Sequence, residues 1–192
     1  MKRITREIAA GERTRGIVVY GRGRHFSSGA DLDDLIGALK EDASACGCGG
    51  AAARSILLDN LSSFRFFEEL AVPVVAAIRG VCLGSGLELA LFCHARICGS
   101  GSVLGLPETG FGLIPGCGGI LNLAALAGRR RALEYALTGS SFGAEEARAM
   151  NIVDAVVPRK DVVSSAVRLI EKIDGHGGYD RGRIRGYINR YM

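Results

Sequence analysis

Residues 73–93 read Pro-Val-Val-Ala-Ala-Ile-Arg-Gly-Val-Cys-Leu-Gly-Ser-Gly-Leu-Glu-Leu-Ala-Leu-Phe-Cys, and the architecture predicted for the chain follows from them. Residues 74–78 form a short apolar run between a proline and a glycine, which is typical of a buried strand. Residues 87–93 are apolar on nearly every side, which predicts a buried helix. A buried strand, a glycine-rich turn and a buried helix in this order indicate an α/β fold.

Similar patterns recur on both sides of this run. Further strands are predicted at residues 16–20, 96–98, 103–106 and 155–157, and helices at 54–70, 117–127, 129–138, 144–150 and 160–173. An acidic helix start is predicted at 31–35, and loops at 42–53 and 107–112. Because strands alternate with helices along the chain, we expect a sheet with parallel pairing.

Gly84-Ser85-Gly86 lies where the buried helix is predicted to begin. The first N–H groups of a helix have no partner within it and lie at the positive end of its dipole, so this turn suits a phosphate or an oxyanion. The residues match neither the lysine-bearing phosphate loop nor the dinucleotide-binding glycine pattern. An oxyanion hole is therefore the better interpretation. The alternative is a tight turn that serves packing alone.

Two glutamates are candidates for proton transfer. Glu88 lies in the first turn of the apolar helix, so its carboxylate is either buried at a cost or lines a cavity. Glu108 follows Pro107 in the predicted loop. Two carboxyl groups near one apolar pocket could divide general acid and general base work, because burial separates their pKa values. The alternatives are a charge that complements the helix dipole for Glu88 and a solvated loop carboxylate for Glu108.

Composition excludes several classes of protein. The 192 residues carry a formal net charge of +4 and no tryptophan, which argues against a nucleic-acid-binding protein. The six cysteines form no Cys-x-x-Cys pair and the three histidines are isolated, so we expect reduced core thiols, no metal site and a cytoplasmic location. Glycines and Pro115 interrupt the longest uncharged run, 109–128, and the first residues lack the apolar core of a signal peptide. We therefore expect no membrane span.

Several segments in unbroken order resemble the crotonase family, the enoyl-CoA hydratases and isomerases. They are residues 25–32 (His-Phe-Ser-Ser-Gly-Ala-Asp-Leu), 73–80, 83–90, 106–108 (Leu-Pro-Glu) and 112–119 (Gly-Leu-Ile-Pro-Gly-Cys-Gly-Gly), with further similarity at 132–139 and 144–153. A single motif of this kind is weak evidence, whereas the ordered series is specific.

The resemblance implies a ClpP/crotonase-like spiral of β-β-α units that binds an acyl-CoA thioester, with coenzyme A as part of the substrate and no separate cofactor. It assigns the oxyanion hole to the backbone N–H groups of Ala30 and Ser85. The two hydratase carboxylates of the family correspond to Glu88 and Glu108, which favours water addition across a 2-enoyl thioester. The further substrate-binding positions that it implies are Gly29, Asp31, Leu32, Gly84, Gly86, Pro115 and Gly116.

The chain departs from the family pattern at three positions and at its ends. Ser85 replaces a glycine of the loop, Asp33 stands where many members carry a basic residue, and His94 replaces a common aspartate. We interpret residues 1–158 as a crotonase-like core and residues 159–192 as a shortened C-terminal helical segment.

The helix predicted at 160–173 carries a broad apolar stripe, so we expect residues 159–192 to mediate a homo-oligomer, a trimer or a hexamer. The alternative is that this helix folds back on its own subunit. Two other functions stay open. One is a crotonase-fold isomerase, hydrolase or decarboxylase that acts on another acyl thioester. The other is a non-catalytic partner in a heteromeric assembly.

Overall fold

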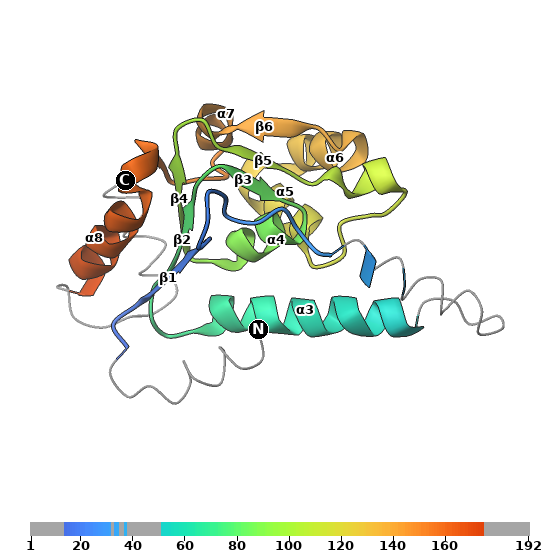
Figure 1. Ribbon diagram of the computed structural model, residues 1–192, viewed down its shortest axis with the longest axis horizontal. Coiled ribbons are helices and arrows are strands. Elements are labelled where there is room, and N and C mark those ends of the chain that lie inside the picture. Colours follow the sequence, from blue (N-terminus) through green and yellow to red (C-terminus); the bar gives the residue numbers. More distant parts are fainter. Residues whose placement is uncertain (1–13, 32, 35–36, 38–50, 175–192) are drawn as a thin grey trace.

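Two small sheets form the centre of the molecule (Figure 1). The computed structural model describes residues 14–174 except 32, 35–36 and 38–50. The first sheet is parallel and has the order β1-β2-β4-β7, with bounds Ile17–Tyr20, Val74–Ile78, Ala95–Gly99 and Ala155–Val157. The second sheet has the order β3-β5-β6, with bounds Val81–Leu83, Val103–Gly105 and Ser141–Gly143.

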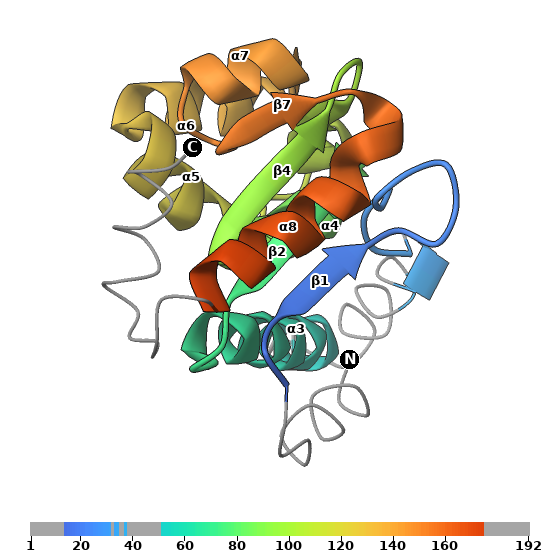
Figure 2. The same ribbon diagram turned by 90° about the vertical axis from the view of Figure 1, so that its left-hand side faces the viewer.

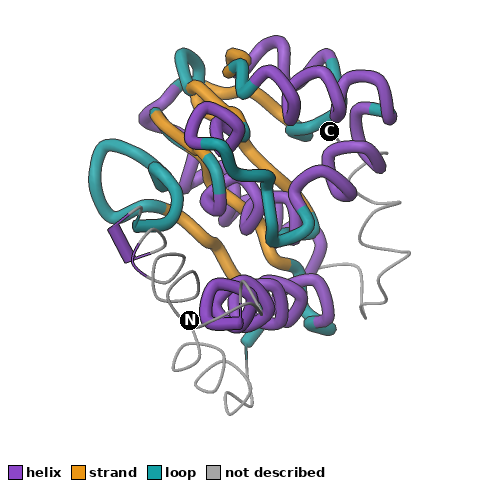
Figure 3. The backbone as a smooth tube through the Cα atoms, turned by 90° about the vertical axis from the view of Figure 1, so that its right-hand side faces the viewer, coloured by secondary structure: helices purple, strands orange, loops and turns teal. Residues whose placement is uncertain are grey.

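Two pairs of consecutive strands, β2–β3 and β4–β5, have one strand in each sheet, and helices follow each pair. β2 and β3 precede α4 (Ser85–Phe92), and β4 and β5 precede the 3₁₀ helix η1 (Pro107–Phe111), α5 (Gly119–Ala127) and α6 (Arg129–Thr138). β6 is followed by α7 (Ala144–Ala149), β7, the 3₁₀ turn η2 (Arg159–Asp161) and α8 (Val162–Asp174), while α3 (Ala51–Glu69) connects to β2. This repetition is the expected spiral of β-β-α units, so the predicted fold class is confirmed. Figure 3 shows the strands lying between helices.

The parallel sheet is buried on both faces. All five residues of β2 are buried, and they alternate between two apolar clusters. Val74, Ala76 and Ile78 pack in the cluster that includes α4, whereas Val75 and Ala77 pack against α8. This alternation follows from the period of two of a strand, and it explains why β2 reads as an uninterrupted apolar run.

The apolar stripe of α8 faces the chain's own sheet. Val162, Ala166, Leu169, Ile170 and Ile173 are buried in one cluster with residues of β2 and β4. Figure 2 shows α8 crossing in front of the strands. The stripe therefore needs no second subunit to cover it, and the sequence-based reason for placing this helix at an interface was wrong.

Of the helices that the structure describes, none is both long enough and apolar enough to cross a bilayer.

Several local predictions differ from the structure. β3 and β6 were not predicted, because three residues are too few to show an alternating pattern. Strands therefore do not strictly alternate with helices, and β5 pairs with β6 in the antiparallel direction. The predicted loop at 107–112 contains η1, and α3 begins at Ala51, inside the loop predicted at 42–53.

Buried thiols and one buried arginine complete the core. The cysteines described by the structure are free and buried, as expected for reduced thiols that pack as small apolar residues; they are Cys82, Cys93, Cys98 and Cys117. The side chain of Arg96, 3% exposed, donates hydrogen bonds to the backbone oxygens of Ile152 and Cys93, each at 2.7 Å, and pairs with Asp154 at 3.4 Å. Arg96 thus joins the end of α4 to the segment before β7.

Candidate active site

The segment that carries Ala30 runs alongside β3. Ser27 forms a parallel β-bridge with Cys82, and the Leu83 N–H donates a hydrogen bond to the backbone carbonyl oxygen of Ser27 at 3.0 Å. This register brings the next turn beside the glycine loop. A Cβ atom on Gly29 would lie 3.8 Å from the backbone nitrogen of Ser85. Gly29, the residue before Ala30, and the start of α4 are therefore brought together.

The glycine loop forms the N-terminal end of α4. Gly84 precedes the helix with φ +54°, and its carbonyl accepts the N–H of Glu88 at 3.0 Å. The backbone N–H groups of Ser85, Gly86 and Leu87 lie before this first helical hydrogen bond, so they have no acceptor within the helix. They point away from the start of α4, where the helix dipole favours negative charge. This arrangement suits an oxyanion.

Glu88 is held by the start of α5. Its side chain is 2% exposed, and its Oε1 atom accepts the backbone N–H of Cys117 at 2.8 Å and that of Gly119 at 2.9 Å. A Cβ atom on Gly119 would lie 2.8 Å from Glu88 Cγ, so only glycine allows this approach. Both hydrogen bonds end on one carboxylate oxygen, which fixes the orientation of the group.

Glu108 approaches the same region from η1. Pro107 begins this 3₁₀ helix, and Gly112 ends it in the left-handed conformation. The Oε1 atom of Glu108 would lie 3.1 Å from a Cβ atom on Gly84, and its Oε2 atom is buried without a hydrogen-bond partner. The carboxyl group of Glu108 therefore lies against the glycine loop, and its Oε2 atom makes no hydrogen bond.

The two glutamates share one electrostatic environment. Burial raises the pKa of Glu88, and the N–H groups of Gly119 and Cys117 oppose this rise. Burial also raises the pKa of Glu108; its own backbone N–H opposes the rise, and the negative charge of Glu88 adds to it. Because the two carboxyl groups act on each other, they suit a reaction in which one holds a proton while the other is ionised.

The remaining predicted positions lie at different places. Asp31 is exposed, and its Oδ1 accepts the N–H of Asp33 at 3.0 Å, so it caps the short helical turn that follows. Pro115 is buried, and a Cβ atom on Gly116 would lie 2.8 Å from Leu57 in α3. Leu32 lies outside the described residues. A Cβ atom on Gly86 would lie 2.5 Å from that of Ser27, so this glycine allows close packing beneath the loop.

Sequence reasoning missed Cys117 and Gly119 as the groups that hold Glu88. The available signal was the glycine run before an apolar helix, which is the same pattern that pointed to residues 84–86. The two histidines that the structure describes have structural contacts instead. His94 Nδ1 accepts the N–H of Val74 at 3.0 Å, and His25 Nδ1 accepts that of Val81 at 3.1 Å. The described part of the chain contains no cluster of His, Cys, Asp or Glu suited to a metal ion.

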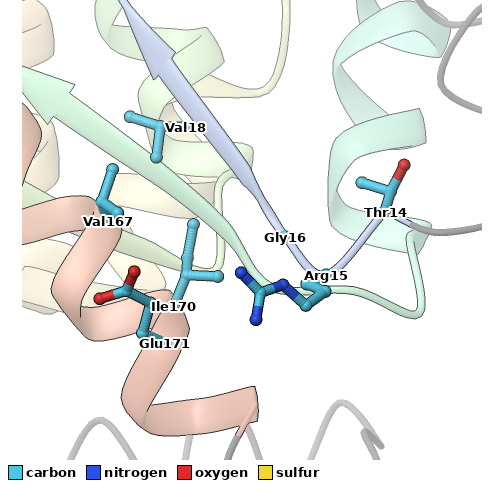
Figure 4. Close-up of a pocket in the computed structure, with 7 residues that line it drawn as sticks. All are labelled: Thr14, Arg15, Gly16, Val18, Val167, Ile170 and Glu171. Atoms are coloured by element: carbon cyan, nitrogen blue, oxygen red, sulfur yellow. The ribbon is translucent and has the colours of Figure 1, made fainter.

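A separate cavity lies on the other face of the parallel sheet. It has a volume of about 260 Å³ and is lined by Thr14, Arg15, Gly16, Val18, Val167, Ile170 and Glu171. Figure 4 shows these residues on β1, the segment before it, and α8. Since α8 and α4 cover opposite faces of the sheet, this cavity is not part of the glutamate site.

Comparisons with known proteins agree with this geometry. The family model described as enoyl-CoA hydratase/isomerase matches residues 6–177. The fatty acid oxidation complex subunit alpha of Shewanella loihica is 40% identical over 167 residues, which are 85% of this chain and 22% of that protein. The chain thus spans about a fifth of the length of this curated relative.

Solved structures match over more of their length. The enoyl-CoA hydratase of Bacillus anthracis has a TM-score of 0.80 and 33% identity, covering 98% of this chain and 68% of that one. DspI of Pseudomonas aeruginosa has a TM-score of 0.82 and 28% identity, covering 97% and 67%. With the crotonase fold, the paired glutamates and a family match over most of its residues, the chain belongs to the enoyl-CoA hydratase/isomerase family.

Proposed function

We propose that this protein adds water across the double bond of a 2-enoyl-CoA thioester. The observation that carries the proposal is the pair of glutamates, from α4 and η1, that act on each other electrostatically beside the glycine loop. The relative named as a fatty acid oxidation complex subunit alpha supports a fatty acyl chain on that thioester.

In the proposed reaction, the backbone N–H groups of Ala30 and Ser85 bind the thioester oxygen. As water attacks C3, the electrons of the double bond move to this oxygen and form an enolate. Two N–H donors at the positive end of α4 stabilise that charge as it develops. The register of residues 27–29 with β3 supports this role, because it brings both backbone segments to one place.

The two carboxyl groups then divide the proton transfers. Glu88, held by two N–H donors that favour its ionised form, takes a proton from the attacking water. Glu108, whose pKa is raised by burial and by the charge of Glu88, carries the proton that it delivers to C2. One O–H bond of water and the O–H bond of Glu108 break, one C–O bond, one C–H bond and an O–H bond on Glu88 form, and the enolate returns to a thioester. The proton on Glu88 then passes through water to Glu108, which restores both carboxyl groups.

The test is a spectrophotometric assay of hydration with crotonyl-CoA and longer 2-enoyl-CoA substrates. We expect loss of the enoyl absorbance, and a decrease of ~10²–10⁴-fold in turnover for Glu88→Gln and for Glu108→Gln. The exposed Glu134→Gln is the matched control and should keep the wild-type rate. An isomerase would move a double bond without adding water, so product analysis separates the two reactions. If none of these substrates loses its enoyl absorbance, the proposal is contradicted.

We further propose that the chain forms a homo-oligomer, a trimer or a hexamer, in a reducing cytoplasmic setting. Among the described residues, nine large apolar side chains are exposed, and five of them come from the η1–α5–α6 region: Phe111, Ile114, Leu121, Leu133 and Leu137. Exposed apolar side chains of this kind favour association. Light scattering tests it, since a mass near 20.2 kDa would show a monomer.

A further inference from the structure

The end of α6 lies against η1, the element that carries Glu108. β5 and β6 pair in the antiparallel direction, with Gly105 opposite Ser141. Two residues beyond this pair on each segment are Pro107 and Gly139. A Cβ atom on Gly139 would lie 3.6 Å from the Cα atom of Pro107. The register of the two strands therefore continues into η1 and the end of α6.

The contact between α6 and η1 leaves no room for a side chain at Gly139. A Cβ atom there would lie 2.9 Å from the Oγ1 atom of Thr109, which is closer than Cβ atoms approach other atoms. This Oγ1 atom is buried and makes no hydrogen bond with the part of the chain that the structure describes. Threonine carries two heavy atoms on its Cβ and has few rotamers, so its side chain does not turn aside easily. An added methyl group at Gly139 would therefore push against η1 through Thr109.

The end of α6 is held in place from its other side. The N–H of Gly139 donates to the carbonyl oxygen of Tyr135 at 2.9 Å, and Gly139 has φ +66°. The hydroxyl group of Tyr135 donates a hydrogen bond to Glu146 of α7, and its ring packs edge to face against Phe142 of β6, with 4.7 Å between the ring centroids. Because Tyr135 joins α6 to α7 and β6, a methyl group at Gly139 would displace η1 more easily than α6.

Glu108 thus lies between two glycines. Gly84 lies against its carboxyl group, and Gly139 lies against the residues immediately before and after it. The N–H of Gly84 also donates to the carbonyl oxygen of Gly105 at 3.0 Å, so the glycine loop is tied to β5, the strand that precedes η1. A displacement of η1 at Gly139 would therefore change the distance between the Glu108 carboxyl group and the loop.

We propose that Gly139 is a positioning residue, which fixes the position of the Glu108 carboxyl group beside the glycine loop by letting η1 lie directly on the end of α6. The role rests on the proposed function in that Glu108 is the proton donor of the hydration. Gly139 touches no reacting atom in this scheme and acts only through η1. The role also differs from that of a helix cap, because asparagine could adopt the positive φ of a cap but would still carry a Cβ atom.

The test is a double-mutant cycle, read as kcat and KM for hydration. Gly139→Ala adds the Cβ atom, and Thr109→Ala removes the Oγ1 atom that it would meet. Gly101→Ala is the matched control for backbone strain, since Gly101 has φ +73° and a Cβ atom there would meet no other atom within 4 Å. Gly139→Asn adds a Cβ atom with less strain, and it serves in each measurement if the alanine variant does not fold. Circular dichroism checks the fold of each variant.

We expect Gly139→Ala to lower kcat by ~10–10²-fold beyond the loss in Gly101→Ala, with KM within about twofold of the wild-type value, because a displacement of about 1 Å of a catalytic group has an effect of this size. Gly139→Asn should lower kcat as well. In the Thr109→Ala background, Gly139→Ala should cost no more than Gly101→Ala does. Equal losses in Gly139→Ala and Gly101→Ala, a wild-type kcat in Gly139→Asn, or no relief from Thr109→Ala would overturn the role.

A second measurement separates this inference from the proposed reaction. Titration of ¹³C-labelled glutamate carboxyl groups by NMR, with Glu108→Gln to assign the signal, follows the ionisation of Glu108 without any substrate. Burial and the charge of Glu88 raise the pKa of Glu108, and Cys117 is the other titratable group of the described residues that interacts with it. Displacement from the loop reduces both effects, so the midpoint should fall in Gly139→Ala.

The midpoint should return to that of Thr109→Ala when Thr109→Ala and Gly139→Ala are combined, and it should stay at the wild-type value in Gly101→Ala. These results are expected even if no 2-enoyl-CoA is hydrated. An unchanged midpoint in Gly139→Ala would overturn the positioning role whatever the enzyme catalyses.

Discussion

The Oε1 atom of Glu108 lies 3.1 Å from the point where a Cβ atom on Gly84 would stand. The same glycine has φ +54° and ψ −131°, a conformation that residues with a side chain rarely adopt. The absence of a side chain at Gly84 therefore serves two purposes. It allows the turn that begins α4, and it leaves space for a carboxyl group from η1 beside that turn.

Gly84→Ala should therefore reduce hydration activity by ~10²-fold or more, because the added methyl displaces Glu108 from the loop. The matched control is Gly101→Ala. Gly101 also has a positive φ, +73°, but a Cβ atom there would meet no other atom within 4 Å. Both variants carry backbone strain, so their difference in kcat measures the contact with Glu108. Equal losses in the two variants would show that strain alone is responsible.

Ser85 should act through its backbone N–H. Ser85→Gly keeps this group and should retain most activity, whereas Ser85→Pro removes it and should lower kcat by ~10²–10³-fold. Proline is compatible with the first position of α4, so the fold should survive. Steady-state kinetics, with circular dichroism as the control for folding, distinguish the variants. If glycine is as damaging as proline, the hydroxyl group matters and the oxyanion role of Ser85 is wrong.

Glu108→Gln should make the protein more stable at neutral pH. The folded-state pKa of Glu108 is raised, so the folded protein binds this proton more tightly than the unfolded chain does. Stability is then lost as the pH rises from the ordinary glutamate pKa through the raised value. Glutamine has no such dependence. Thermal unfolding should show a higher midpoint for the variant at neutral pH, and the difference should vanish in acid below the ordinary pKa.

Arg96→Ala should destabilise the fold by about 2–4 kcal/mol, since it leaves the backbone oxygens of Ile152 and Cys93 without their donor and removes the side-chain partner of the half-buried Asp154 carboxylate, which keeps only the backbone N–H of residue 96. Arg131→Ala is the control, because the pair of Arg131 with Glu134 is half exposed and should contribute under 1 kcal/mol. Urea denaturation measures both. A loss below 1 kcal/mol for Arg96→Ala would contradict its role in joining α4 to the segment before β7.

The long elements and the candidate carboxyl groups could be predicted from the residues. β2 and α4 are evident because their apolar character exceeds what a surface element carries, and Glu88 stands out because a charge in such a helix is costly. The short strands β3 and β6 could not be found in the same way. Three residues show no period, and these strands exist because neighbouring segments pair with them.

The apolar stripe of α8 shows the limit of such reasoning. Burial of apolar surface is favourable wherever it occurs and has no direction, so the stripe predicted that α8 is covered but not what covers it. In the structure its own sheet does so, through Val75, Ala77, Ala95 and Ile97.

The same limit applies to the groups that hold Glu88. Cys117 and Gly119 lie 29 and 31 residues further along the chain, and both are small residues in a glycine run. Residue type determined which side chains could carry a proton or a charge, because that chemistry is local. The tertiary structure decided which backbone N–H groups bind Glu88, and it decided that Glu108 lies against Gly84. Both contacts form because the two sheets and their helices bring distant segments together. No local sequence pattern relates the residues that each contact joins.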